Sequence, residues 1–161
     1  MGRRPKASRA SGPPDTTERL QRYVPYLVNQ LSSLWTTMQN GELGKDEINA
    51  VALRTLAALY IHQSLTVNEI AALAMTEQST ASRTIDTMVS AGWVERTIAE
   101  KDLRRRMIAL TAAGEALLLK VWPAMEKNYT TLTKGISARD IDVCAKVLAQ
   151  MIDNMSGIRN D

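Results

Sequence analysis

Residues 66–111 read TVNEIAALAMTEQSTASRTIDTMVSAGWVERTIAEKDLRRRMIALT, and this stretch decides the fold. Thr66 and Glu69 have the spacing of a capping box, in which the two side chains satisfy each other's backbone N–H groups. This box opens a short apolar helix, and Thr76 is placed to cap a second helix that ends near Gly92. Two helices joined by a tight turn predict a helix-turn-helix unit.

The residue pattern changes after Gly92 from helical to β-like. Residues 93–98 and 107–110 alternate loosely between apolar and polar side chains, whereas residues 99–106 between them are polar and charged. Two short runs of this kind around a polar connection predict a two-stranded ribbon with an exposed, basic tip. Together with the helix-turn-helix unit, the ribbon predicts a mainly α fold with a small β-wing, the winged helix-turn-helix.

Four further segments carry apolar residues three or four positions apart, which predicts a helix in each. These helices are expected within residues 15–45, 46–62, 112–134 and 137–155. Pro25 predicts a kink or a fresh helix start in the first, and Pro123 predicts a bend in the third, which Thr111 is placed to cap. The apolar stripe of the last helix consists of Ile141, Cys144, Leu148, Met151, Ile152 and Met155.

The composition fits one compact domain. The chain has 161 residues, of which 45% are hydrophobic, and it contains eight Met but no Phe, so its core is aliphatic and suited to helices. The single Cys excludes an internal disulfide. The basic N-terminus lacks the apolar run of a signal peptide, and no apolar stretch is long enough to span a membrane. We therefore expect a cytoplasmic protein.

Positive charge is concentrated at the N-terminus. The net charge is +3, but residues 1–14 contain four basic and no acidic residues, so the remainder sums to −1 (+3 − 4). The composition of residues 1–14, which is rich in Arg, Pro, Gly and Ser, cannot bury apolar area and predicts a disordered basic tail. Overall basicity is therefore weak evidence for nucleic-acid binding, and the body of the chain must supply local basic clusters.

The second helix of the helix-turn-helix unit has the composition of a DNA-recognition helix. Apolar residues such as Ala81, Ile85, Met88 and Val89 can face the core, which leaves small hydrogen-bonding side chains and a cation on the other side. Gln suits adenine and Arg suits guanine in the major groove. The alternative is a merely solvated helix face, and the helix alone does not decide between the two. The candidate DNA contacts here are Thr76, Gln78, Ser79, Thr80, Ser82 and Arg83.

The expected ribbon tip adds a basic cluster with a local charge of +2. A protruding hairpin with Arg at its tip can reach the minor groove, where negative potential is strongest over A·T runs. The alternative, a charged hairpin that only keeps the protein soluble, does not explain why the ribbon follows the helix directly. The candidate contacts at the tip are Lys101, Asp102, Arg104, Arg105 and Arg106.

Residues 66–118 resemble the MarR family of bacterial regulators (multiple antibiotic resistance regulators). The resemblance rests on the motifs LTVNEIA (65–71), QSTASRTID (78–86), AGWVER (91–96), DLR (102–104) and LTAAG (110–114). An Asp-x-Arg wing motif followed by Leu-Thr-x-x-Gly is specific when it comes after a helix-turn-helix. Flanking helices extend the resemblance over roughly residues 16–157. Leu103 departs from the pattern, because many members have a second Arg or a Lys there.

The resemblance implies a homodimeric transcription regulator that binds palindromic operators in double-stranded DNA. The family usually represses genes, and small aromatic or anionic ligands frequently relieve repression. Arg104 corresponds to the wing Arg that enters the minor groove, and Asp102 would orient it through a charge-assisted hydrogen bond. A winged-helix module that binds proteins without binding DNA is the alternative. The implied division is a disordered basic tail (1–14), an N-terminal dimerisation helix (15–45), a winged helix-turn-helix DNA-binding domain (46–111) and C-terminal dimerisation helices (112–161).

The remaining chemistry-bearing residues give weaker expectations. In the family, an effector pocket lies between the dimerisation helices and the winged domain. Cys144 on an apolar stripe predicts a buried, inert thiol rather than a redox switch. One His and one Cys far apart predict no metal site, and without paired carboxylates or a nucleophile–base pair we expect no cofactor and no enzyme. The candidate effector contacts, alternatively core or dimer contacts, are Trp35, Met38, His62 and Trp122.

Overall fold

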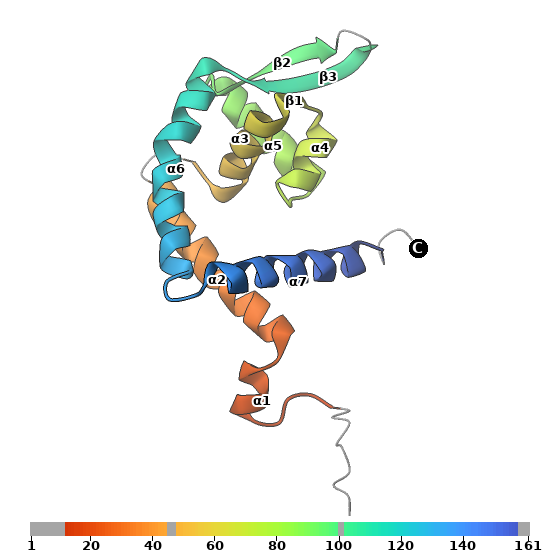
Figure 1. Ribbon diagram of the computed structural model, residues 1–161. Coiled ribbons are helices and arrows are strands. Elements are labelled where there is room, and N and C mark those ends of the chain that lie inside the picture. The colour runs from red at the N-terminus through yellow and green to blue at the C-terminus, as the bar shows by residue number, and fades with distance from the viewer. Residues whose placement is uncertain (1–11, 45–47, 100–101, 158–161) are drawn as a thin grey trace, which may run out of the picture.

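The computed structural model describes residues 12–44, 48–99 and 102–157 (Figure 1). The expected mainly α fold with a small β-wing is confirmed. The helices are α1 (Thr17–Gln21), α2 (Val24–Leu43), α3 (Ala50–His62), α4 (Val67–Leu73), α5 (Gln78–Ser90), α6 (Ala112–Leu132) and α7 (Ala138–Gly157). The strands are β1 (Ser64–Leu65), β2 (Val94–Ala99) and β3 (Asp102–Leu110).

Helices α3, α4 and α5 gather below the β2–β3 ribbon and form one lobe with it (Figure 1). Helix α6 leads away from the base of the ribbon and packs against both α3 and α2 before the chain turns into α7. Each element of the lobe contributes apolar side chains to one core, which fixes the elements relative to one another. Central members of this core are Leu56, Leu59, Ile70, Ile85, Met88, Val94, Ile108 and Leu118.

The sheet has three antiparallel strands in the order β1-β3-β2, which corrects the two-stranded expectation. Residues Ser64 and Leu65 pair with Ala109 and Ile108 of β3. A strand of two residues is too short to show an alternating pattern, so the sequence gives no sign of it. Strand β3 also begins earlier than expected, at Asp102, because backbone pairing with β2 extends into the charged segment.

Local signals at the helix ends were mostly predicted correctly. The Thr66–Glu69 capping box is present, and Thr111 accepts a hydrogen bond from the backbone N–H of Gly114 at 3.1 Å. Pro25 lies in the first turn of α2, so it marks a fresh helix start, as one of the two expected outcomes. The bend expected at Pro123, which lies inside α6, stays a prediction.

Two helix starts differ from expectation. Helix α3 begins at Ala50 and not near residue 46, which lies outside the described residues, because Asn49 is the N-cap and accepts from the N–H of Ala52 at 2.9 Å. Helix α5 begins after Glu77, which occupies the N-cap position without a side-chain cap. Thr76 therefore does not cap α5. The N-cap of α5 is one residue later in the chain than the sequence suggested.

Helices α2 and α7 present apolar side chains to solvent in the single chain. No described side chain of α7 is buried, and Val147, Met151 and Ile152 are exposed by 47%, 37% and 64%. On α2, Leu31 and Leu34 are exposed by 45% and 59%. These two helices thus carry the largest uncovered apolar faces of the described chain. None of the described helices combines the length and the apolar character needed to cross a membrane.

Cys144 is exposed, which corrects the expected buried thiol. The apolar stripe on which it lies was identified correctly, but α7 brings this stripe against no core of its own chain. An apolar stripe identifies one face of a helix and does not indicate what covers that face.

Candidate DNA-binding surface

Helix α5 buries one face and presents the other. Ala81, Ile85 and Met88 are fully buried in the lobe, and Val89 is half-buried, as its helical spacing predicted. Burial of this face turns the opposite side of α5 to solvent. The candidate contacts on that side are exposed at Gln78, Ser79, Thr80 and Arg83 and half-buried at Ser82.

The turn between α4 and α5 combines a left-handed residue with a side-chain hydrogen bond from α3. Met75 adopts a left-handed conformation (φ 52°) in this turn. Arg54 of α3 donates from Nε to the carbonyl oxygen of Ala74 at 2.7 Å, which places a cation at the C-terminal end of α4. Arg54 was not singled out from the sequence, although a lone Arg on an otherwise apolar helix is a signal that could have found it.

The β2–β3 ribbon packs directly beside α5. Arg106 of β3 is exposed, and Asp102, Arg104 and Arg105 belong to the same strand. The structure does not describe the side chains of these three residues, and Lys101 lies outside the described residues. The expected orientation of Arg104 by Asp102 therefore stays a prediction. What the structure establishes is that β2 packs against α5 and that β3, which carries the basic cluster, pairs with β2.

An ion pair joins the recognition helix to the ribbon. Arg96 of β2 donates from Nη2 to Oδ1 of Asp86 on α5. The side chains remain 40% and 60% exposed, so the pair lies at the protein surface beside the polar face of α5. Both residues lie within motifs quoted above, but their pairing requires the folded arrangement and has no signal in the sequence.

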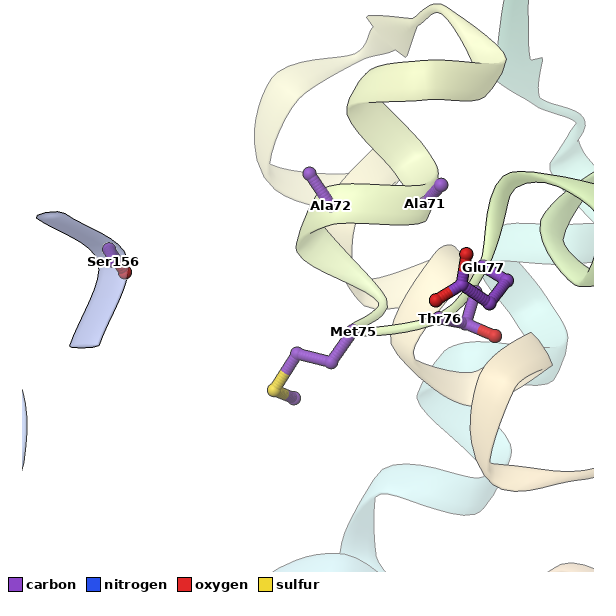
Figure 2. Close-up of a pocket in the computed structure, with 6 residues that line it drawn as sticks. All are labelled: Ala71, Ala72, Met75, Thr76, Glu77 and Ser156. Carbon is purple, nitrogen blue, oxygen red and sulfur yellow. The ribbon is translucent and has the colours of Figure 1, made fainter. Parts of the chain in front are cut away.

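A wide, open hollow of about 740 Å³ separates the α4–α5 turn from the end of α7. In Figure 2, Met75 projects from the turn toward Ser156 of α7, and Thr76 and Glu77 lie at the start of the segment leading into α5. Thr76, half-buried, thus borders this hollow as well as the start of the recognition helix.

A smaller and more apolar pocket of about 370 Å³ lies between α3 and α6. Of the candidate effector contacts, only Trp122 lines it. Trp35 and Met38 are half-buried on α2, and His62 is exposed at the end of α3. The lining residues are Ala57, Tyr60, Ile61, Leu118, Leu119 and Trp122. Across the described ranges, no group of three or more His, Cys, Asp or Glu is arranged to hold a metal ion.

Comparison with known proteins agrees with this arrangement. The MarR family model matches residues 48–105, which span α3 to the start of β3. This matched segment contains the helix-turn-helix unit and most of the ribbon. The structure is also similar to a MarR family transcriptional regulator from Silicibacter pomeroyi, with a TM-score of 0.82 and 28% identity over 88% of this chain and 95% of that one. The resemblance of the motifs to the MarR family is therefore confirmed.

Two further relatives match the chain at lower identity. A mutant MarR from E. coli, solved in complex with operator DNA, has a TM-score of 0.70 and 22% identity, covering 80% of this chain and 92% of that one. A curated HTH-type transcriptional regulator of Bacillus subtilis, YwaE, is 22% identical over 80% of this chain and 75% of its own length. The likeness in fold thus extends beyond the winged-helix domain to the flanking helices.

Proposed function

We propose that this MarR family protein is a sequence-specific, DNA-binding transcription regulator that acts as a homodimer in the cytoplasm. The observation that carries the proposal is the orientation of α5. Its apolar face is buried in the core, so that Gln78, Ser79 and Arg83 face outward on the helix that packs against the ribbon, whose strand β3 is rich in Arg. A relative with the same fold has been solved with operator DNA, which supports the same use of this surface here.

The proposed DNA contacts divide between the two grooves. Helix α5 enters the major groove, where Gln78 suits adenine and Arg83 suits guanine. Arg104 enters the minor groove, oriented by Asp102. The remaining candidates are small or basic side chains that suit phosphate oxygens. These are Thr76, Ser79, Thr80, Ser82, Lys101, Arg105 and Arg106.

The proposed dimer forms through α2 and the C-terminal helices. A helix of 20 residues such as α7 is marginal in water unless tertiary packing covers its apolar face, and no described side chain of α7 is buried in its own chain. A second copy offers the same kind of apolar face, so the two copies can cover each other around a twofold axis. Residues 15–45 and 112–161 are accordingly proposed as dimerisation segments that flank the DNA-binding domain.

Selection from a pool of random DNA duplexes tests this function. The wild-type protein should enrich a palindrome whose half-sites lie about 10 bp, or a multiple of that, apart. Its affinity should fall steeply with salt, because phosphate contacts release counterions. If no duplex shows salt-sensitive binding, the alternative of a protein-binding winged-helix module is favoured.

Replacing Arg104 by Ala should weaken binding to the selected duplex by about 5- to 150-fold, since a good base contact is worth about 1–3 kcal/mol. The effect should be largest on duplexes whose wing-facing segment is rich in A·T. Fluorescence anisotropy measures the affinity, and circular dichroism checks the fold. Lys127→Ala, which removes one exposed cation from α6, is the control and should bind normally. Normal binding by Arg104→Ala would rule out the wing assignment.

We further propose that the protein is a repressor whose operator binding is relieved by a small aromatic ligand in the α3–α6 pocket. The lining is apolar apart from the hydroxyl of Tyr60 and the indole N–H of Trp122, so it recognises the ring more than an anionic group. Benzamide should then weaken operator binding by about 5- to 150-fold, the usual range of allosteric coupling. Leu119→Glu should abolish this response and keep ligand-free operator affinity. An unchanged response in this variant would contradict the assignment of the pocket.

A further inference from the structure

We propose that the Asp86–Arg96 ion pair is a positioning device for DNA binding: it holds the wing at a fixed angle to the recognition helix without touching DNA. The inference rests on the proposed function and concerns the same surface. It assigns a role to two residues that would otherwise be read as an isolated acid and an isolated base near the phosphates.

The position of Arg96 on the ribbon supports this role. Val94, two residues earlier and therefore on the same face of β2, is 2% exposed and packs in the core. Arg96 is paired in register with Ile108 of β3, which is fully buried. The next pair on this face, toward the tip of the wing, is Ile98 with Arg106, and Arg106 is exposed. Arg96 thus lies where the apolar anchoring of the ribbon ends and the protruding wing begins.

The position of Asp86 on α5 completes the geometry. Asp86 follows Ser82 and Arg83 by one helical turn, on the side of α5 that is turned away from buried Ile85. An unpaired acid next to two candidate DNA contacts would repel phosphate. The guanidinium of Arg96 compensates its charge and at the same time connects the middle of α5 to the stem of the wing.

The pair is expected to affect binding more than folding. Exposed ion pairs contribute little to global stability, because solvent screens them. A wing that samples several angles, however, leaves only a fraction of molecules competent to place both the wing and α5 on DNA. The apparent affinity falls in proportion to that fraction. Loss of the pair should therefore lower the affinity for DNA through both the major-groove and the minor-groove contacts. The melting temperature should change little.

The test measures binding to the duplex that the wild-type protein selects from a random pool. Asp86→Asn and Arg96→Gln should each weaken binding roughly 2- to 30-fold, the range typical of residues that act through coupling. Glu95→Gln, on the opposite face of β2, removes one exposed negative charge as Asp86→Asn does and serves as the control. It should bind as tightly as the wild type or more tightly. The reversed pair, Asp86→Lys with Arg96→Glu, should recover most of the lost affinity.

Three outcomes would overturn the inference. If Asp86→Asn binds DNA at least as tightly as the wild type, Asp86 does not hold the wing in a binding position. If Arg96→Gln lowers the slope of log affinity against log salt by about 0.9, Arg96 itself contacts a phosphate. If the reversed pair does not recover affinity, the two residues do not act through each other. Failure of the wild-type protein to select any duplex would instead reject the proposed function.

Discussion

Replacing Met151 on α7 by Asp is expected to lower affinity for the palindromic duplex by about 10²- to 10⁴-fold. Met151 lies in the middle of the exposed apolar stripe of α7, where a carboxylate would have to be desolvated if a second copy covers it. A monomer would bind only one half-site of the palindrome. It would lose the increase in affinity that arises when two linked DNA-binding lobes bind both half-sites. Analytical ultracentrifugation measures the oligomeric state, and fluorescence anisotropy measures the affinity.

Ala149→Asp provides the matched control for this prediction. It creates the same residue two positions away, on the side of α7 that faces away from the stripe, and Ala149 is also exposed. This variant should remain dimeric and should bind the duplex normally. A Met151→Asp protein that remains a dimer with full affinity would show that α7 does not contribute to the dimer contact.

Replacing Gly114 by Ala should destabilise the protein by about 3 kcal/mol, although Ala is the better helix former. A Cβ at this position would lie 1.9 Å from the carbonyl oxygen of Trp93 and 2.9 Å from its carbonyl carbon. Both atoms belong to the backbone, so the start of α6 and the base of the ribbon would have to separate. The melting temperature, measured at fixed protein concentration, should fall by roughly 6–12 °C.

Gly41→Ala is the control for this second prediction. An added Cβ on Gly41 in α2 would meet nothing within 4 Å. Because no steric clash opposes the higher helix propensity of Ala, the free energy of unfolding of this variant should rise by up to about 1 kcal/mol. If Gly114→Ala were as stable as the wild type, the close approach of Trp93 to α6 would not exist in solution.

Features that depend on neighbouring residues in the chain could be predicted from the sequence. The capping box at Thr66, the cap at Thr111 and the helix start at Pro25 are local, because a side chain acts there on the backbone of its own turn. The helical period likewise identified the buried face of α5, since Ile85 and Met88 recur at the spacing of one face. Together with the β-like pattern after Gly92, these signals predicted the fold class and the buried face of α5.

Features that depend on contacts between distant segments could not be predicted in this way. The two residues of β1 become a strand only because β3 lies beside them. The bond from Arg54 to the Ala74 carbonyl spans 20 residues, and the Asp86–Arg96 pair joins a helix to a strand. The exposure of Cys144 could not be predicted for the same reason. Its stripe is evident in the sequence, but the stripe is not covered by the described part of its own chain.

The joint between the ribbon and α6 has a consequence for how the wing can diversify. Thr111 donates from its backbone N–H to the carbonyl of Trp93 at 3.1 Å and from its hydroxyl to the carbonyl of Gly92 at 2.6 Å. Both acceptors are backbone atoms, so they persist whatever side chains the ribbon carries. Substitutions along the wing can therefore change its side chains while the ribbon keeps its attachment to α6. The side chains of the wing can vary in this way as long as Thr111 and Gly114 are retained.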